Sequence, residues 1–512
     1  MNISKILVSL VAISMATSAY AKPVELILRL KERVSMEELA KNVSDPASPR
    51  FRKYYSAEEI KALSAPSASD YANLLIQLKA QGFKVVRESK SHLYVTVQAD
   101  HSQVEKTFNT TFQISGNKST AKFVGFAKRV SVPSALDLVS SVSGMDQTSR
   151  MHPHMKMPNM KGATASKGIS QDIIKTAYGY KAVHSTGVKG KGQQIAIATY
   201  DGFHLSDIQA FYQKSGISPA PAVDQVKFNG DPAIKEDSAA ETALDAEFSG
   251  MMAPEAKIHV FASAENSDAG ELALFTAILD DGRAKILNYS WGTCETRVTP
   301  EHQADMDKVY ARAAAQGVTI LVASGDSGAD GCGDGTKVAD WPASQPFALA
   351  VGGTSFAMSA GKLDESGWSL GGGGISALYS LPDYQSHFQS PYNKRSMPDV
   401  AFNADQNTGE DIWTSYPDGN PKWLTIGGTS MAAPQWAGFI ALVNQARAEA
   451  GKSSIGFLNP TLYAMSASDK ANTLHDVTQG NNGYAAGPGW DAVTGFGSLQ
   501  ADQLIEYLVN QN

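Results

Sequence analysis

The feature that most constrains the fold is an alternation that begins after Gly168 and continues through much of the chain. Short apolar runs rich in β-branched residues are separated by longer segments whose apolar residues have helical spacing. The runs are 195–199, 258–262, 285–289, 318–323 and 347–351, and the helical segments are 239–252, 269–281 and 301–316. This alternation predicts an α/β fold, a mainly parallel sheet flanked by helices, with functional residues in loops at the carboxyl ends of strands.

The first part of the chain has a different pattern. Residues 24–28 and 92–97 alternate like strands, and residues 69–81 carry apolar side chains at helical spacing. Strands and helices in this order predict a small α+β domain. The periodicity stops between Ser149 and Lys167, where four methionines lie among His, Pro, Lys and Gly. We interpret this stretch as an exposed linker of the kind that proteases cut.

The first 21 residues have the features of an export signal. Lys5 precedes an apolar run at 6–16, and Ala19-Tyr20-Ala21 has the small-x-small form of a signal-peptidase site. A membrane anchor is the alternative, but about 11 apolar residues are too few to span a bilayer. The sequence therefore predicts a signal peptide at 1–21 and a secreted or periplasmic protein that does not bind a membrane.

Charge is divided unevenly along the chain. Residues 1–167 contain 23 Lys and Arg against 13 Asp and Glu, a balance of +10, whereas residues 168–512 contain 21 against 38, a balance of −17. A basic first part and an acidic remainder predict two bodies that attract one another. The basic residues are scattered rather than clustered, which argues against a nucleic-acid partner.

The chain has two cysteines, Cys294 and Cys332. An even number of cysteines in an exported protein favours one disulfide between them, and two free buried thiols are the alternative. Closing a loop of this length would stabilise the fold by about 4 kcal/mol in the chain-entropy model.

The most specific local motif is Gly-Gly-Thr-Ser-Met-Ala-Ala-Pro at 427–434, which leads into an apolar helix. Small residues allow a sharp turn that puts Ser430 at a helix N-terminus, where its hydroxyl is accessible and the helix dipole favours an anion. A lone serine at such a position is usually an N-cap. The whole octet, however, resembles the nucleophile segment of the subtilisin clan.

A nucleophilic serine needs a base, and none of the ten histidines lies in the context that subtilisins use. At the corresponding place in the strand–helix order stand Glu241 and Asp245, four residues apart and therefore on one face of a helix. A solvated acidic face is the ordinary explanation of such a pair, and we expect it to apply to Glu247.

Asp326 lies in a glycine-rich turn directly after the apolar run at 318–323. Subtilisins have an asparagine here, whose amide donates to the oxyanion of the tetrahedral intermediate. An aspartate can donate to that oxyanion only when it is protonated, which is easiest to maintain at low pH.

Together Ser430, Glu241, Asp245 and Asp326 resemble the sedolisins, the serine-carboxyl peptidases of subtilisin-like fold, and the segment 44–51 is typical of their propeptides. The resemblance implies a prodomain at 22–148, an activation linker at 149–167 and a catalytic domain at 168–512. It also implies an acid-active endopeptidase made as a zymogen and inhibited by its own prodomain. Ser430 would attack the peptide carbonyl, Glu241 would act as general base and then acid, Asp245 would orient Glu241, and Asp326 would line the oxyanion hole. We expect polypeptide substrates and a monomer.

A second group of residues suits a cation. Asp476 and Asp491 lie in segments rich in glycine, and carboxylates with exposed carbonyls are ligands for a hard cation. Turn aspartates that bind their own backbone are the alternative. The resemblance implies one calcium ion bound by Asp476, Asp491 and the carbonyls of Val477, Gly487 and Gly489.

The chain departs from the family pattern at one point. Some members extend the proton network from a glutamate toward a tryptophan; Trp291 matches the tryptophan, but Thr199 stands where the glutamate would be, with Asp201 nearby. We expect Ser290, Trp291 and Gly292 to bind substrate through their backbone. The other readings are a tripeptidyl aminopeptidase of the same family, a subtilisin that works at neutral pH with Asp201 as its aspartate, and an inactive binding homologue.

Overall fold

The structure is a computed structural model that describes residues 23–115, 122–126, 130–144, 150–157, 168–386 and 392–511. The predicted signal peptide at 1–21 lies outside these residues, as does much of the predicted linker. A search of the described residues finds no helix with the length and hydrophobicity needed to cross a membrane.

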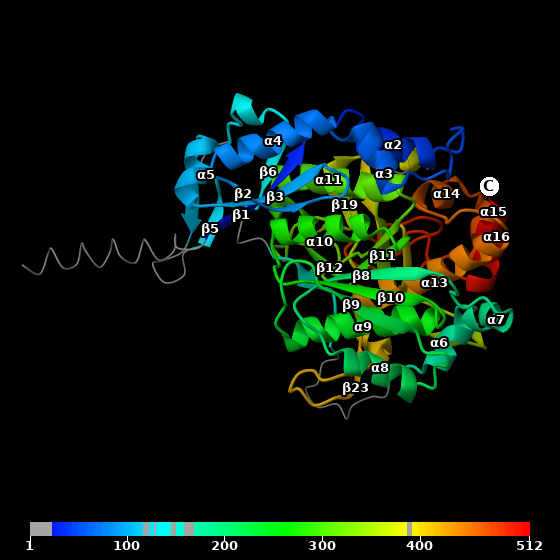
Figure 1. The fold of residues 1–512 in the computed structure, drawn as a ribbon. Helices are drawn as coiled ribbons and strands as arrows, with labels where there is room; N and C mark the ends of the chain where they lie inside the picture. Colours follow the sequence, from blue (N-terminus) through cyan, green and yellow to red (C-terminus); the bar gives the residue numbers. More distant parts are fainter. Residues whose placement is uncertain are drawn as a thin grey trace, which may run out of the picture.

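The N-terminal part contains a four-stranded sheet in the order β2-β3-β1-β6, with helices packed on it (Figure 1). Its core strand β1 (Val24–Leu30) pairs antiparallel with both neighbours. The other strands are β2 (Lys84–Glu88), β3 (Tyr94–Ala99), β4 (Phe112–Ser115), β5 (Lys122–Phe126) and β6 (Val139–Ser143); the helices are α2 (Met36–Ser44), α3 (Ala57–Ser64), α4 (Ala68–Ala80) and α5 (His101–Thr107), with a 3-10 turn η1 (Ser134–Leu136). The predicted small α+β domain is confirmed.

The larger part is built on a sheet in the order β24-β25-β21-β15-β13-β11-β8-β10-β9. Its central strands, from β21 to β9, all run parallel. The strands are β8 (Gln194–Tyr200), β9 (Ala222–Val226), β10 (Lys257–Ser263), β11 (Ile286–Tyr289), β13 (Thr319–Ala323), β15 (Leu349–Ser355), β21 (Val400–Asn403), β24 (Leu474–His475) and β25 (Ser498–Leu499). The predicted parallel α/β sheet is confirmed.

Helices cover both faces of this sheet (Figure 1). On one face α9 (Glu236–Met252) packs against α13 (Thr429–Glu449), and on the other α10 (Asp268–Asp281) packs against α11 (Pro300–Ala315). Two cores follow, one on each face, because a parallel sheet is buried on both sides. The α9 helix shows no amphipathic periodicity because it is buried almost all round.

Shorter elements complete the described part of the chain. The strands are β7 (His152–Pro153), β12 (Trp291–Cys294), β14 (Asp340–Trp341), β16 (Met358–Ser359), β17 (Lys362–Leu363), β18 (Ser366–Gly367), β19 (Gly374–Ser380), β20 (Lys394–Met397), β22 (Glu410–Thr414) and β23 (Lys422–Ile426). The helices are α6 (Gln171–Ala177), α7 (Tyr180–Ser185), α8 (Leu205–Lys214), α12 (Asp383–Ser386), α14 (Asn459–Ala464), α15 (Ala467–Thr473) and α16 (Ala501–Asn510), with 3-10 turns η2 (Glu295–Arg297) and η3 (Gln406–Thr408).

The two parts meet through an apolar contact between α2 and α11. Met36, Leu39 and Val43 of α2 belong to the same buried cluster as Met306 and Val309 of α11. Burial of such side chains is worth about 25 cal/mol per Å² of apolar surface. The attraction between the two parts is therefore hydrophobic as well as electrostatic.

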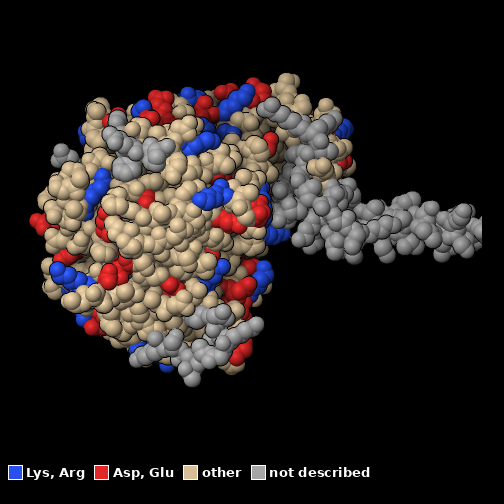
Figure 2. Space-filling model, turned by 180° about the vertical axis from the view of Figure 1, so that it is seen from behind, with Lys and Arg blue, Asp and Glu red and all other residues tan. Residues whose placement is uncertain are grey.

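In the ion pairs around this contact, either part can supply the basic residue. Arg29 of β1 donates to Asp305 of α11 at 2.5 Å, as the charge balances predict. Lys308 of α11, however, pairs with Glu32 at 3.1 Å and Glu37 at 2.6 Å in the N-terminal part. On the face of the molecule in Figure 2, Lys and Arg are interspersed with Asp and Glu. The net charges thus understate how mixed the contact is.

Candidate active site

Ser430 is the second residue of α13 and is fully buried. The helix begins after Gly428, whose φ of +108° favours glycine and turns the chain sharply into the helix. The Ser430 hydroxyl donates to the carbonyl of Ser290 at 3.3 Å. The predicted strand-to-helix turn is present; it aims the Ser430 hydroxyl at the end of β11 and the Ser430 backbone N–H at the His154 carbonyl.

Glu241 and Asp245 lie on α9, both completely buried. Because α9 packs against α13, their carboxyl groups lie on the side of Ser430, whose hydroxyl is close enough to lower the pKa of Glu241. Neither Glu241 oxygen has a hydrogen-bond partner among the described residues, so the Ser430 hydroxyl must rotate away from Ser290 to reach it. Catalytic hydrogen bonds often tighten only once a substrate is bound.

Burial sets the protonation of this pair. It raises the pKa of Glu241 well above its ordinary value, and the neighbouring Asp245 raises it further. Burial also raises the pKa of Asp245, against hydrogen bonds from Ser290 and Asn288 that lower it. Two carboxyl groups in one dry site cannot both ionise easily, so they hold at least one proton between them over the acid range.

A hydrogen-bond chain fixes Asp245. The Ser290 hydroxyl donates to Asp245 Oδ1 at 2.6 Å, and the Asn288 amide donates to the Ser290 hydroxyl at 3.1 Å. The sequence pattern predicts only a backbone role for Ser290 and no role for Asn288. Both stand at the carboxyl end of β11, the position where α/β folds gather functional residues, and that placement is the signal that could have found them.

Asp326 follows β13 and faces the start of α13. Its Oδ1 accepts from the Thr429 backbone N–H at 2.8 Å and from the Thr429 hydroxyl at 2.9 Å, whereas its Oδ2 is buried and has no partner among the described residues. Burial raises the pKa of Asp326 to about 7, although the Thr429 hydrogen bonds and Lys156 oppose the shift. Because Oδ1 is occupied by donors, the proton of the neutral acid belongs on Oδ2, the oxygen that is free to donate.

Part of the predicted linker lies in this site, which corrects the expectation that it is exposed. Residues 150–157 cross the ends of β12 and α13, and His154 is buried. Lys156 and Gly427 exchange two backbone hydrogen bonds, of 2.9 and 2.8 Å. The stretch shows no periodicity in the sequence because its hydrogen-bond partners lie in two separate segments, at 290–292 and at Gly427, rather than in one sheet.

The expectation for Glu247 is wrong, and the contacts of Asp201 can be described. Glu247 is fully buried, not part of a solvated acidic face; it accepts from the Trp413 backbone N–H at 3.1 Å, and burial raises its pKa well above the ordinary value. Asp201 accepts from Lys235 at 2.8 Å and from the Ser238 hydroxyl at 2.9 Å, so it ties β8 to the start of α9.

At the position where the resemblance implies a glutamate, the chain has two hydroxyl groups. Thr199 Oγ1 and Thr242 Oγ1 lie 2.8 Å apart and are buried. The indole N–H of Trp291 is buried without a partner among the described residues, and its ring packs edge-on against Tyr200 at 5.1 Å. No carboxylate therefore connects Trp291 to the site among these contacts.

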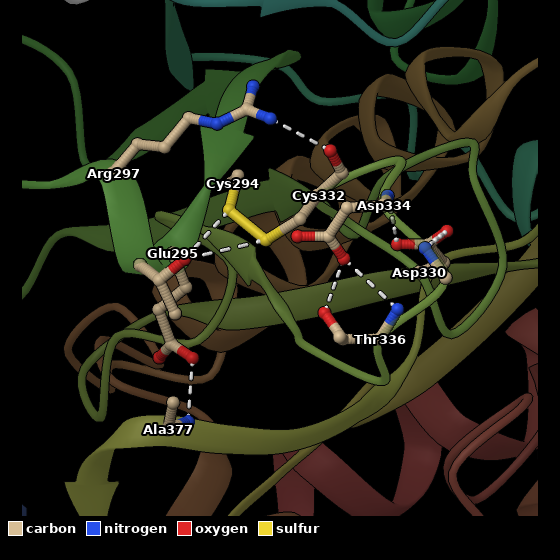
Figure 3. The surroundings of a disulfide bond; sticks show 10 residues. Cys294, Glu295, Arg297, Asp330, Cys332, Asp334, Thr336 and Ala377 are labelled. Carbon is tan, nitrogen blue, oxygen red and sulfur yellow. Dashed lines mark hydrogen bonds between the residues drawn. A yellow bond between two sulfur atoms is a disulfide. The ribbon is translucent and has the colours of Figure 1, made fainter.

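The two cysteines form the predicted disulfide (Figure 3). It joins Cys294, at the end of β12, to Cys332 in the loop that follows Asp326. Arg297 reinforces the connection by donating to the Cys332 carbonyl at 2.9 Å. The bond thus ties β12, which pairs with β7 of the linker, to the loop beside the candidate oxyanion hole.

The predicted cation ligands come together in one loop. Asp476 Oδ2 accepts from the Gly489 N–H at 2.8 Å and Asp491 Oδ2 accepts from the Gly487 N–H at 2.9 Å, while the Val477 side chain is buried. The described residues contain no group of three or more His, Cys, Asp or Glu suited to a metal. Both carboxylates accept from backbone N–H groups of the loop, as turn aspartates do, and two carboxylates with backbone carbonyls are also the oxygen ligands that a hard cation such as calcium takes.

Comparisons with known proteins agree with this architecture. Residues 11–148 match the family described as "Pro-kumamolisin, activation domain", and residues 235–497 match the "Subtilase family". Kumamolisin of Bacillus sp. (strain MN-32) is 32% identical, over 92% of this chain and 89% of its own length. Tripeptidyl-peptidase 1 of Bos taurus is 28% identical, over 94% of this chain and 91% of its own.

A solved structure extends the likeness to three dimensions. Pseudomonas sedolisin, a serine-carboxyl proteinase complexed with two molecules of pseudo-iodotyrostatin, is 31% identical with a TM-score of 0.60. The match covers 68% of this chain and 99% of that one. The chain therefore belongs to the sedolisin family of serine-carboxyl peptidases, with a subtilisin-like fold and an N-terminal activation domain.

Proposed function

We propose that this peptidase is an endopeptidase that works in acid through an acyl-enzyme on Ser430, with Glu241 and Asp245 as the acid–base pair and Asp326 in the oxyanion hole. The observation that supports it most is the arrangement at the start of α13. There the Ser430 backbone N–H donates to a peptide carbonyl of the linker at 3.1 Å, and the free Oδ2 of Asp326 faces the same turn.

Each of these residues has a defined role in the mechanism. The Ser430 oxygen attacks the substrate carbonyl while Glu241 takes its proton, and Glu241 then gives that proton to the leaving amine. Asp245 shares a proton with Glu241 and is itself held by Ser290. The Ser430 N–H and the protonated Asp326 donate to the oxyanion. Donors that are already in place stabilise the negative charge that develops there in the transition state.

The raised pKa of Asp326 supports an acid optimum. Asp326 donates only while protonated, and its pKa of about 7 leaves it increasingly ionised above neutrality. Glu241 can accept a proton only after its pair with Asp245 has lost one of its two protons, so activity should fall again at low pH, where both carboxyl groups are protonated. The two limbs together predict a bell-shaped profile that lies on the acid side.

The course of the linker favours endopeptidase over tripeptidyl-peptidase activity. The carbonyl that accepts from the Ser430 N–H is that of His154, so three residues, 152–154, lead up to the bond in the site. Met151 lies before them, and its backbone exchanges hydrogen bonds of 2.8 Å with the Asn266 side chain. The site therefore accommodates a chain that continues beyond three residues on that side. An N-acetylated decapeptide tests this, because an enzyme that requires a free N-terminus leaves it intact and releases tripeptides from the unblocked form.

We also propose that the chain is exported, that its N-terminal domain inhibits it in cis, and that one calcium ion stabilises the loop. The linker in the cleft supports inhibition, since it excludes other substrates. Asp476, Asp491 and the carbonyls of Val477, Gly487 and Gly489 would hold the ion. Bound calcium would supply stability to the folded loop by mass action and takes no part in the proton transfers.

The decisive experiment compares wild type with Ser430→Ala on a blocked peptide from pH 3 to 8. We expect wild type to be most active in acid and Ser430→Ala to have no turnover at any pH. Normal turnover by purified Ser430→Ala would remove the nucleophile assignment, and an equal rate at pH 4 and pH 8 in wild type would remove the role of Asp326. Recovery of the protein from the periplasm or medium tests export.

A further inference from the structure

The N-terminal part places one tyrosine ring in a slot of the larger part. Tyr54 lies in the loop between α2 and α3, and its ring enters between two loops of the larger part. One loop, which contains Gly317, joins α11 to β13, and the other, which contains Gly456, joins α13 to α14. The Tyr54 hydroxyl donates to the carbonyls of Ser454 at 3.1 Å and Ile455 at 2.9 Å. The slot therefore contacts both the flat ring and the hydroxyl.

Two glycines make room for this ring. A side-chain carbon placed on Gly317 would lie less than 3.0 Å from a ring carbon of Tyr54, and one placed on Gly456 would lie less than 3.0 Å from the Tyr54 hydroxyl oxygen. Gly317 follows the end of α11, where a left-handed glycine ends many helices, so its φ of +71° alone does not indicate a site. The two close approaches do, because they come from separate loops and meet on one side chain.

The walls of the slot are joined to one another without Tyr54. The Thr319 hydroxyl donates to the Gly456 carbonyl at 2.6 Å, and the Ser454 hydroxyl donates to the Gly317 carbonyl at 3.4 Å. Both hydrogen bonds connect the loop after α11 to the loop after α13, and both belong to the larger part. The slot is therefore already formed before a ring enters it, which lowers the entropic cost of binding.

The end of the slot selects a hydrogen-bond donor. Backbone carbonyls accept hydrogen bonds and cannot donate them, so the Ser454 and Ile455 oxygens require a group with a proton. Burial raises the pKa of Tyr54 to about 12, although Arg52 and Arg447 lower it, so the hydroxyl stays protonated in acid and neutral solution. A ring with an ether oxygen at this place would leave both carbonyls without a donor.

The slot and the active site lie at opposite ends of β13. Gly317 comes just before this strand, and Asp326 follows its end, where the chain meets the start of α13. The strand has five residues and is about 16 Å long. A ring held in the slot therefore does not occupy the place of a substrate at Ser430.

We propose that the slot between Gly317 and Gly456 is a binding site for small phenols on the catalytic domain. Tyr54 fills it in the complete chain, and removal of the N-terminal domain opens it. The proposal goes beyond the proposed function and does not rest on it, because it concerns binding alone and uses neither Ser430 nor the acid–base pair. It implies that a free phenol competes with Tyr54 and so weakens the attachment of the N-terminal domain.

The first experiment empties the slot in the complete chain. Tyr54→Ala keeps the β-carbon and removes one phenol group, so phenol itself has the shape of the space that is left. The substitution is combined with Ser430→Ala, in which self-digestion is absent, and phenol binding is measured by isothermal titration calorimetry. We expect one phenol to bind the double variant, and at least tenfold weaker binding to Ser430→Ala, whose slot is filled. No binding to the double variant, or equal affinity of the two proteins, would overturn the proposal.

Anisole tests recognition of the hydroxyl. It has the same ring, with a methyl group in place of the hydroxyl hydrogen, so it cannot donate to the Ser454 and Ile455 carbonyls. We expect the double variant to bind anisole at least tenfold more weakly than phenol. Equal affinity for anisole and phenol would show that the space is an apolar cavity that does not recognise phenols.

Two glycines near each other in the chain give a matched pair of substitutions in the double variant. Gly456 has a φ of +64° and Gly451 a φ of +71°, but a side-chain carbon on Gly451 would meet no atom within 4 Å. Asparagine tolerates this backbone conformation better than most residues. Gly456→Asn should fill the end of the slot and weaken phenol binding at least tenfold, whereas Gly451→Asn should leave the Kd within twofold. Equal effects of the two substitutions on the Kd would place the bound phenol outside the slot and refute the proposal.

Discussion

Replacing Asp326 by asparagine tests the oxyanion donor through pH. The carboxyl oxygen that accepts from Thr429 has its equivalent in the amide carbonyl, and the amide NH₂ takes the place of Oδ2, the oxygen that faces Gly428. An acid whose pKa is about 7 is protonated in about one molecule in ten at pH 8, and this fraction falls tenfold for each further pH unit. An amide donates at every pH, so Asp326→Asn should lose this alkaline decline.

The same substitution should also change how the free energy of unfolding depends on pH. The pKa of Asp326 is about 7 in the fold against an ordinary value of 3.8, so the folded state binds this proton more tightly than the unfolded chain does. The stability that the fold gains from this proton is fully present below about pH 4 and is lost as the pH rises through 7. At 1.36 kcal/mol per pKa unit the loss is about 4 kcal/mol as an upper bound. Asp326→Asn should therefore match wild type at pH 3.5 and be more stable at pH 8.

Two measurements check these effects. One is kcat/KM on a blocked peptide from pH 3 to 8 for both proteins, and the other is denaturant unfolding of Ser430→Ala with and without Asp326→Asn, in which self-digestion is absent. The reasoning fails if the two activity profiles run parallel above pH 6, because Asp326 would then not be the titrating donor. It also fails if asparagine lowers stability at pH 8.

The remaining predictions concern the base, the disulfide and the cation. Glu241→Gln should lower kcat by at least a hundredfold because an amide cannot take a proton, whereas Glu247→Gln, on the same helix but bonded to β22, should keep kcat within threefold; equal losses in steady-state assays would contradict the assignment. Replacing Cys294 and Cys332 by serine opens a loop that spans 38 residues and should lower the free energy of unfolding by about 4 kcal/mol. A change below about 1 kcal/mol in urea titration would contradict this chain-entropy value. Prolonged EDTA treatment should lower the Tm of wild type but not of Asp491→Ala, and elemental analysis that finds no calcium in wild type would count against the site.

The parts of the fold that could be predicted from sequence were those with a local pattern. The β-branched runs mark the central strands because a strand buried on both faces must be apolar along its length. Ser430 was identifiable because a glycine-rich turn precedes it, and Asp326 because it lies in a glycine-rich turn after an apolar run. Glu241 and Asp245 were identifiable as a pair because residues four apart lie on one face of a helix.

The rest depends on contacts between segments that are far apart in the chain. Glu247 is buried because β22, more than 160 positions later, covers it, and no local pattern in α9 announces that. His154 lies in an aperiodic stretch, and only its contacts with Ser290 and Ser430 give it a place. The Asn288–Ser290–Asp245 chain likewise joins two elements, β11 and α9, that the sequence separates.

The contact between α2 and α11 has a consequence for the life of the enzyme after activation. Met306 and Val309 share a buried cluster with Met36 and Leu39, so removal of the N-terminal domain uncovers apolar surface that the catalytic domain was assembled against. We therefore expect the mature enzyme to persist because it unfolds slowly, rather than because its fold is strongly favoured once the N-terminal domain is gone. Denatured mature enzyme should fail to recover activity by itself and should recover it when residues 22–148 are supplied as a separate chain.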